Sequence, residues 1–139
     1  MKEVYSRILK EITSKGVKVR HKRGFSDNGE YNYETNTITI DHSIKNTLTG
    51  CVVLYHEFGH ALDFRYNRHR RFYRYDTAKL NISRAEQIKV VWKAEWGCFE
   101  YARNRLRRFG IRQKDHYYLS KTWTKKNLLP LWINLYLDS

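Results

Sequence analysis

The sequence predicts an α+β protein in which a small, mostly antiparallel sheet packs on two of its helices. Three segments carry apolar residues at helical spacing, whereas shorter stretches between residues 17 and 40 alternate apolar and polar side chains as strands do. The chain has 139 residues, of which 41% are hydrophobic, and it contains neither an internal repeat nor an evident linker. We therefore expect one domain over residues 1–139.

The first helix is predicted over residues 2–14, where apolar side chains recur on one face. Those side chains are Val4, Ile8, Leu9 and Ile12. Gly16 interrupts the pattern, and residues 17–20 alternate like a short strand. The chain is thus expected to pass directly from a helix into a sheet.

Two further strands are predicted at residues 31–33 and 37–40. The turn-forming pair Asn28-Gly29 precedes the first of them, and only residues 34–36 separate the two. This spacing is typical of a hairpin or meander.

The second helix is predicted to begin at Thr47 or Thr49, either of which can cap it, and to fade near Tyr66. A third, longer helix is expected to run from an N-cap at Ser83 to about residue 109. Gly110 is its natural stop.

The second helix carries the most informative motif of the chain, His56-Glu57-Phe58-Gly59-His60. Residues four apart lie on one helix face, so His56 and His60 can bind one zinc ion together. Glu57 lies about 100° around the helix, where it borders the site and suits a general base. A coincidental surface motif is the alternative, but the apolar residues just upstream favour a buried helix.

A third protein ligand is needed, because catalytic zinc is usually held by three. The extended metzincin pattern is excluded, since Asp63 and Tyr66 stand where it requires Gly and His. On the third helix, Glu95 falls within the apolar stripe, where a lone carboxylate is costly unless a cation pairs with it. Glu95 is therefore the preferred ligand, and a buried ion pair with an arginine is its alternative role. Glu100 lies on the polar side and is the alternative ligand.

These segments resemble zincin metallopeptidases that use a glutamate as third ligand, the gluzincin-like group. The small ImmA/IrrE-type peptidases and the catalytic domain of anthrax lethal factor belong to the proteins that the chain resembles. The likeness rests on residues 55–63 and 93–99, and residues 29–33 and 37–40 are similar to the strand before the metal helix.

The resemblance implies a zincin-like domain with endopeptidase activity that depends on one Zn²⁺ ion. It implies His56, His60 and Glu95 as ligands and Glu57 as general base. It also implies that an edge strand, which we expect at residues 37–40, binds a protein or peptide substrate by β-augmentation.

Some of these relatives place a Tyr just before the glutamate helix to stabilise the oxyanion, and this chain has none there. Tyr117, Tyr118 or His116 in the C-terminal tail could take that role, although each also fits a structural one. Asp63 could accept a histidine N–H from the ligand side of the second helix. A helix-end salt bridge to Arg65 is the alternative for Asp63.

Cys51 and Cys98 are expected to be buried free thiols, with a zinc-ligand role as the alternative. The first residues lack the apolar segment of a signal peptide, and no apolar run is long enough to span a bilayer. We therefore expect a cytoplasmic protein with no membrane partner. Its small size and Lys-, Tyr- and Asn-rich composition suggest a phage-encoded protein, which would act in the host cytoplasm.

The net charge of +13 predicts an acidic partner, either a nucleic acid or an acidic protein. One cluster of arginines follows the second helix and is interleaved with aromatic residues, and another lies at the end of the third helix. Such clusters are typical of nucleic-acid contacts, and for either cluster alone a solvated helix face is the alternative explanation. The predicted nucleic-acid contacts are Arg68, Arg70, Arg71, Arg74, Arg105 and Arg108.

Two other functions are therefore kept beside the endopeptidase. One is a SprT-like DNA-associated protease, although the His-Gly context of that group's third ligand is absent after His60, where His69 is followed by Arg70. The other is a non-catalytic, zinc-containing protein that binds nucleic acid or another partner.

Overall fold

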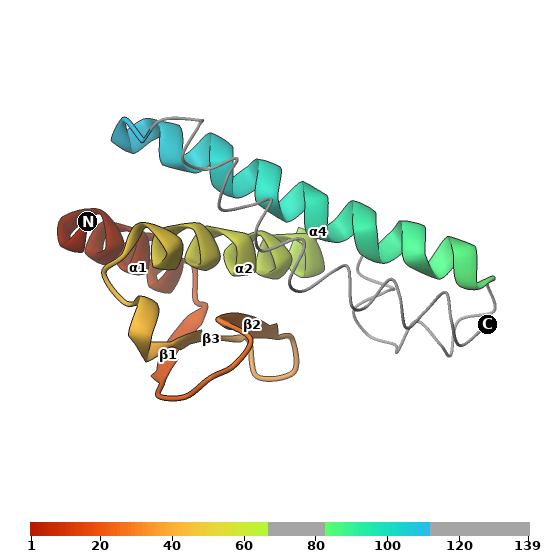
Figure 1. The fold of residues 1–139 in the computed structure, drawn as a ribbon, viewed down its shortest axis with the longest axis horizontal. Coiled ribbons are helices and arrows are strands. Elements are labelled where there is room, and N and C mark those ends of the chain that lie inside the picture. The colour runs from red at the N-terminus through yellow and green to blue at the C-terminus, as the bar shows by residue number, and fades with distance from the viewer. Residues whose placement is uncertain (67–82, 112–139) are drawn as a thin grey trace.

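The computed structural model describes residues 1–66 and 83–111 (Figure 1). Its helices and strands follow one another as α1 (Lys2–Ser14), β1 (Lys18–Lys22), β2 (Gly29–Asn32), β3 (Thr37–Asp41), α2 (Leu48–Tyr66) and α4 (Arg84–Leu106). Two short 3-10 turns, η1 (His42–Ile44) and η3 (Arg107–Phe109), accompany them. The α+β class is confirmed, and the assignment of one domain to the whole chain stays a prediction.

The three strands form a mixed sheet in the order β1-β3-β2. β3 pairs in parallel with β1 and antiparallel with β2. After β1 the chain passes through a loop to β2, which lies at the opposite edge of the sheet. A short turn then leads into β3, which lies between β1 and β2. The expected sheet was mostly antiparallel. One of the two strand pairs, β1 with β3, is instead parallel.

This topology corrects one expectation about the sheet. Residues 37–40 belong to the central strand, both sides of which are hydrogen-bonded to neighbouring strands. They cannot accept an added strand. Within the described sheet, the open edges belong to β1 and β2.

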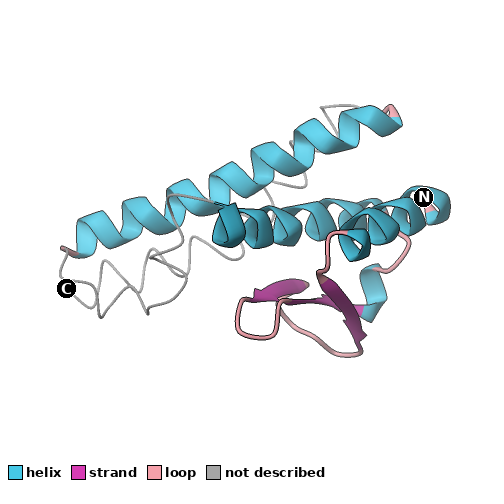
Figure 2. Ribbon diagram, turned by 180° about the vertical axis from the view of Figure 1, so that it is seen from behind, coloured by secondary structure: helices cyan, strands magenta, loops and turns pink. Residues whose placement is uncertain are grey.

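Helix α2 is the centre of the fold. Every side chain from Gly50 to Ala61 is buried, as expected of a helix that is covered on all sides. The sheet lies along one side of α2 and α4 crosses on the other, while α1 packs beside it (Figure 2). The core thus forms around the helix that carries the histidine motif.

Local signals at the ends of the helices agree with the sequence. The Thr47 hydroxyl accepts a hydrogen bond from the N–H of Gly50 at 3.0 Å, which makes Thr47 the cap of α2. Ser83 accepts from the N–H of Glu86 at the start of α4. Gly110 ends the third helical segment with a left-handed φ of 72°.

The crossing of α2 and α4 depends on Gly59, inside the histidine motif. A Cβ atom at this position would lie 3.2 Å from the Sγ atom and 3.3 Å from the Cα atom of Cys98. The missing side chain therefore lets α4 approach α2 closely. Cys51 and Cys98 are buried free thiols, as predicted.

None of the helices in the described part of the chain is long and apolar enough to cross a membrane.

Candidate metal centre

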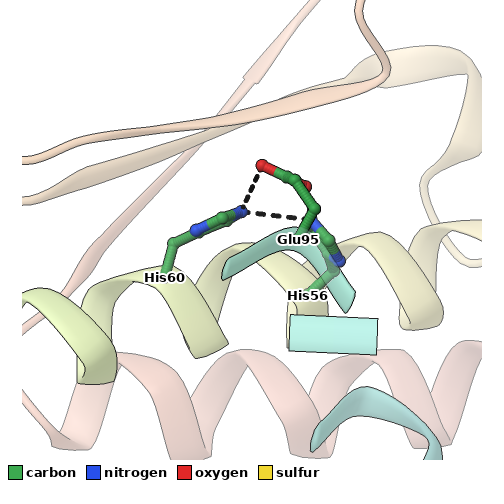
Figure 3. Close-up of polar contacts among 3 residues, drawn as sticks. All are labelled: His56, His60 and Glu95. Carbon is green, nitrogen blue, oxygen red and sulfur yellow. Dashed lines mark hydrogen bonds and ion pairs between the residues drawn. The ribbon is translucent and has the colours of Figure 1, made fainter. Parts of the chain in front are cut away.

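His56, His60 and Glu95 converge at the crossing of α2 and α4 (Figure 3). The Nε2 atom of His56 lies 2.8 Å from Oε2 of Glu95, and the Nε2 atom of His60 lies 3.0 Å from Oε1 of the same carboxylate. The two Nε2 atoms are 3.2 Å apart. Three metal-ligating side chains from two helices therefore point at one place.

The spacing of these three side chains is compatible with binding of one metal ion. Ligands at about 2.0–2.2 Å around a tetrahedral ion are separated from one another by about 3.3–3.6 Å. The observed separations of 2.8–3.2 Å are only slightly shorter. Two imidazoles and one carboxylate are also a ligand set found in catalytic zinc sites, where a fourth position stays open.

The position of Glu95 on α4 and the crossing of α4 with α2 explain why Glu95 contacts the two histidines. Cys98 touches Gly59 at the crossing, and Glu95 is three residues earlier on the same side of α4. Its side chain keeps only 21% of its surface exposed. Glu100, the alternative ligand, instead forms an ion pair with Arg103 on its own helix.

The negative charge of Glu95 favours a positive charge between these groups, since one carboxylate faces two imidazoles. Burial raises the pKa of Glu95, but the charge of His60 and hydrogen bonds from both histidines outweigh burial and lower it. Burial lowers the pKa of His60, but the Glu95 carboxylate and the Cys98 side chain raise it well above its usual value. A proton on His60 or a metal ion can supply this charge.

His56 is the most enclosed of the three. Its side chain is fully buried, and its ring centroid lies 4.2 Å from that of Phe99. Burial lowers the pKa of His56 to about 4, although Glu95 acts in the opposite direction. His56 is therefore held neutral at physiological pH, which is the state that binds metal.

Glu57 is buried beside the cluster of His56, His60 and Glu95, with 4% of its surface exposed. Burial raises its pKa to about 8, the charge of His60 lowers it, and the charges of Glu95 and Glu30 raise it. The backbone N–H of Tyr31 donates a hydrogen bond to the carboxylate. Glu57 thus bridges the helix of the histidines and the sheet.

The hydrogen bond from Tyr31 shows how β2 faces the site. The Asn28 carbonyl accepts from the Asp41 N–H at 2.8 Å, so the peptide groups that pair with β3 alternate from Asn28 onward. The carbonyls of Gly29 and Tyr31 therefore point to the edge of β2 that no described strand covers, whereas the N–H of Gly29 donates to the Asp27 carbonyl at 2.7 Å. This edge, and not β3, runs beside Glu57.

Two groups that contribute to the site were not predicted from the sequence. Cys98 hydrogen-bonds His60, and its position three residues after Glu95 was the available signal. The N–H of Tyr31 orients Glu57, and a backbone group at a strand edge leaves no signal in side-chain chemistry.

Of the remaining residues predicted for the site, three lie within the described part of the chain and seven lie outside it. Asp63 is half-buried near the end of α2, and its hydrogen bond to a histidine stays a prediction. Arg105 forms an ion pair with Glu11 of α1, whereas Arg108 is exposed. The others lie outside the described residues: Arg68, Arg70, Arg71, Arg74, His116, Tyr117 and Tyr118.

Comparisons of the chain with protein-family profiles, with curated proteins and with solved structures found no match. The geometry of this centre is therefore the basis for its chemistry.

Proposed function

We propose that the protein is a zinc-dependent endopeptidase, and that His56, His60 and Glu95 hold the ion. One observation carries the proposal: a three-ligand cluster with zinc-like spacing has a buried carboxylate, Glu57, directly beside it. A purely structural zinc site would be expected to have four protein ligands. Among the described residues, the cluster has three.

The donor set suits zinc by its chemistry as well as its spacing. Imidazole nitrogen and carboxylate oxygen both bind zinc, and the neutral state of His56 favours ligation. A zinc ion held here would lower the pKa of a coordinated water and polarise a peptide carbonyl.

Glu57 would act as the general base and then as the general acid. It takes a proton from the attacking water and delivers it to the nitrogen of the leaving amine. A base works best when its pKa lies near the working pH. Burial holds the pKa of Glu57 at about 8, and a nearby cation would bring it down toward neutrality. The N–H of Tyr31 keeps the carboxylate oriented through both transfers.

The substrate would bind as an extended segment along the open edge of β2. The carbonyls of Gly29 and Tyr31 point to this edge and can accept hydrogen bonds from a peptide backbone. Tyr31 also contacts the proposed base, so a peptide bound there would lie close to the reacting groups.

Glu57→Gln tests the proposal most directly. The variant keeps the shape of the side chain but removes the base, so it should retain one zinc ion per chain and lose proteolysis of an unfolded protein substrate. Zinc content is measured on the purified protein and cleavage by mass spectrometry. Absence of bound zinc in the wild type, or undiminished cleavage by Glu57→Gln, would contradict the proposal.

A non-catalytic zinc protein would give a different result in the same assay. A protein that uses zinc only for structure would bind the ion in both variants and cleave nothing in either. Binding to nucleic acid, or to another acidic partner, stays a prediction. It should weaken steeply with salt if phosphate contacts are involved.

A further inference from the structure

Within the described residues 1–66 and 83–111, no strand covers the two edges of the sheet, and these edges carry opposite charges. Paired residues on neighbouring strands point to the same face, and the register places Arg20, Thr39 and Glu30 in one row across β1, β3 and β2. Arg20 and Glu30 are both exposed. The outer face therefore changes from basic at one edge to acidic at the other.

The basic edge has the features of a protected strand. Lys18, Arg20 and Lys22 alternate along β1 on the exposed face. Charged side chains of this kind discourage another strand from pairing with an edge. β1 is thus guarded against the addition of a basic strand.

The acidic edge belongs to an unusual stretch of the chain. Residues 24–44 contain no Lys or Arg, although the protein carries a net charge of +13. The acidic residues of this stretch are Asp27, Glu30, Glu34 and Asp41. β2 therefore presents negative charge within a strongly positive molecule.

Glu30 is the member of this stretch that the geometry relates to the metal centre. It lies on β2 between Gly29 and Tyr31, whose carbonyls point to the open edge, and its charge acts on Glu57. An antiparallel strand added there would face Glu30 through a non-hydrogen-bonded pair. In such pairs the opposed side chains come closest, and opposite charges attract.

We infer that the open edge of β2 selects an extended peptide segment that carries Lys or Arg opposite Glu30. This inference rests on the proposed endopeptidase function and names its substrate class. Glu30 acts as a specificity residue: it attracts a substrate cation on the exposed face and takes no part in bond cleavage. The basic residues of β1 explain why the same segment would not pair with the other edge.

The test is a competition between peptides in one reaction with zinc-loaded protein. The peptides differ only in having Lys, Gln or Glu at each position around the cleaved bond, and mass spectrometry gives the ratios of kcat/KM. The wild type should favour Lys over Gln by about two- to fivefold at one position, as expected for an exposed cross-strand pair. The preference should shrink in 1 M NaCl, where the Debye length is about 3 Å.

Two substitutions at Glu30 and one matched control sharpen the result. Glu30→Gln should abolish the preference, and Glu30→Lys should shift it toward the Glu peptide. Glu3→Lys makes the same change of net charge at an exposed site on α1 and should keep the wild-type preference. A preference that survives Glu30→Lys, or that Glu3→Lys alters equally, would overturn the inference.

The outcomes separate this inference from the proposed function. Cleavage of all peptides at equal rates would retain the endopeptidase and reject the role of Glu30. If the zinc-loaded protein cleaves nothing, the proposed function fails, and the inference falls with it. Sedimentation provides the last arm: a dimer that dissociates with Glu30→Lys would assign the edge to the basic β1 of a second copy and overturn the inference.

Discussion

Two partly buried carboxylates join helices in this protein, and they are balanced in different ways. Glu11 and Glu95 have similar exposed fractions, 25% and 21%. Glu11 pairs with Arg105 of α4 and accepts a hydrogen bond from the Tyr55 hydroxyl at 2.6 Å. Glu95 instead faces the Nε2 atoms of two histidines.

The difference distinguishes a structural carboxylate from one suited to bind metal. A guanidinium keeps its charge at any physiological pH, so Arg105 balances the charge of Glu11 without an added ion. Imidazoles are neutral or charged depending on their surroundings, so the positive charge beside Glu95 can be a proton or an ion.

Removing the negative charge of Glu95 should have the largest effect on zinc binding. Loss of an outer hydrogen-bonding partner costs about 10- to 100-fold in metal affinity, so Glu95→Gln should lower the affinity by more than about 100-fold. Competition with a chromophoric chelator measures it. Glu11→Gln is the matched control and should bind zinc like the wild type. Equal losses in the two variants would remove the distinction between the two carboxylates.

A side chain at Gly59 should damage the metal centre through the helix crossing. Gly59→Val places atoms against Cys98, and overpacking of this kind costs about 1–3 kcal/mol in the free energy of unfolding. Because α4 would be pushed away, zinc affinity should fall as well. Chemical denaturation and chelator competition measure the two effects.

Gly97→Ala is the control for that substitution, since a Cβ atom there meets nothing within 4 Å. It should leave zinc affinity unchanged and stabilise the helix by up to about 1 kcal/mol. If Gly59→Val bound zinc normally, the close approach of the two helices would not be what places Glu95.

Breaking the Glu11 network should reduce stability without touching the metal centre. Glu11→Gln leaves Arg105 without its ion-pair partner, and we expect a loss of about 1–3 kcal/mol in urea denaturation. The loss should be the same with and without zinc. A loss seen only in the presence of zinc would show that the two regions are coupled.

The pH dependence of stability should differ between protein treated with EDTA and protein loaded with zinc. The pKa of His60 and that of Glu57 are both raised in the folded state, so unfolding releases protons and stability falls as pH rises. Between pH 6.5 and 8, Glu57 alone should contribute roughly 1–2 kcal/mol to this fall.

His56 does not mask this effect, because its pKa of about 4 places its own titration window below pH 6.5. Bound zinc should remove most of the decline, since the ion then supplies the positive charge beside Glu95. Thermal unfolding at several pH values measures both curves. Increasing stability of the EDTA-treated protein over this range would contradict the proton balance described for the centre.

Features that depend on local spacing were predictable from the sequence. A four-residue step places His56 and His60 on one helix face in any protein, and the period of 3.6 residues put Glu95 on the buried side of α4. The hydrogen bonds at Thr47 and Ser83 likewise join residues three apart.

Three other features depend on tertiary contacts: which strands form the edges of the sheet, which carboxylate pairs with Arg105, and what orients Glu57. β3 is the central strand, Arg105 forms an ion pair with Glu11, and the backbone N–H of Tyr31 is hydrogen-bonded to Glu57. These contacts join residues far apart in the chain, so they depend on strand order and helix crossing, which no local pattern encodes. The same crossing adds Glu95 to the histidine pair and forms the candidate metal centre, because Gly59 lets Glu95 come within 3.0 Å of both imidazoles.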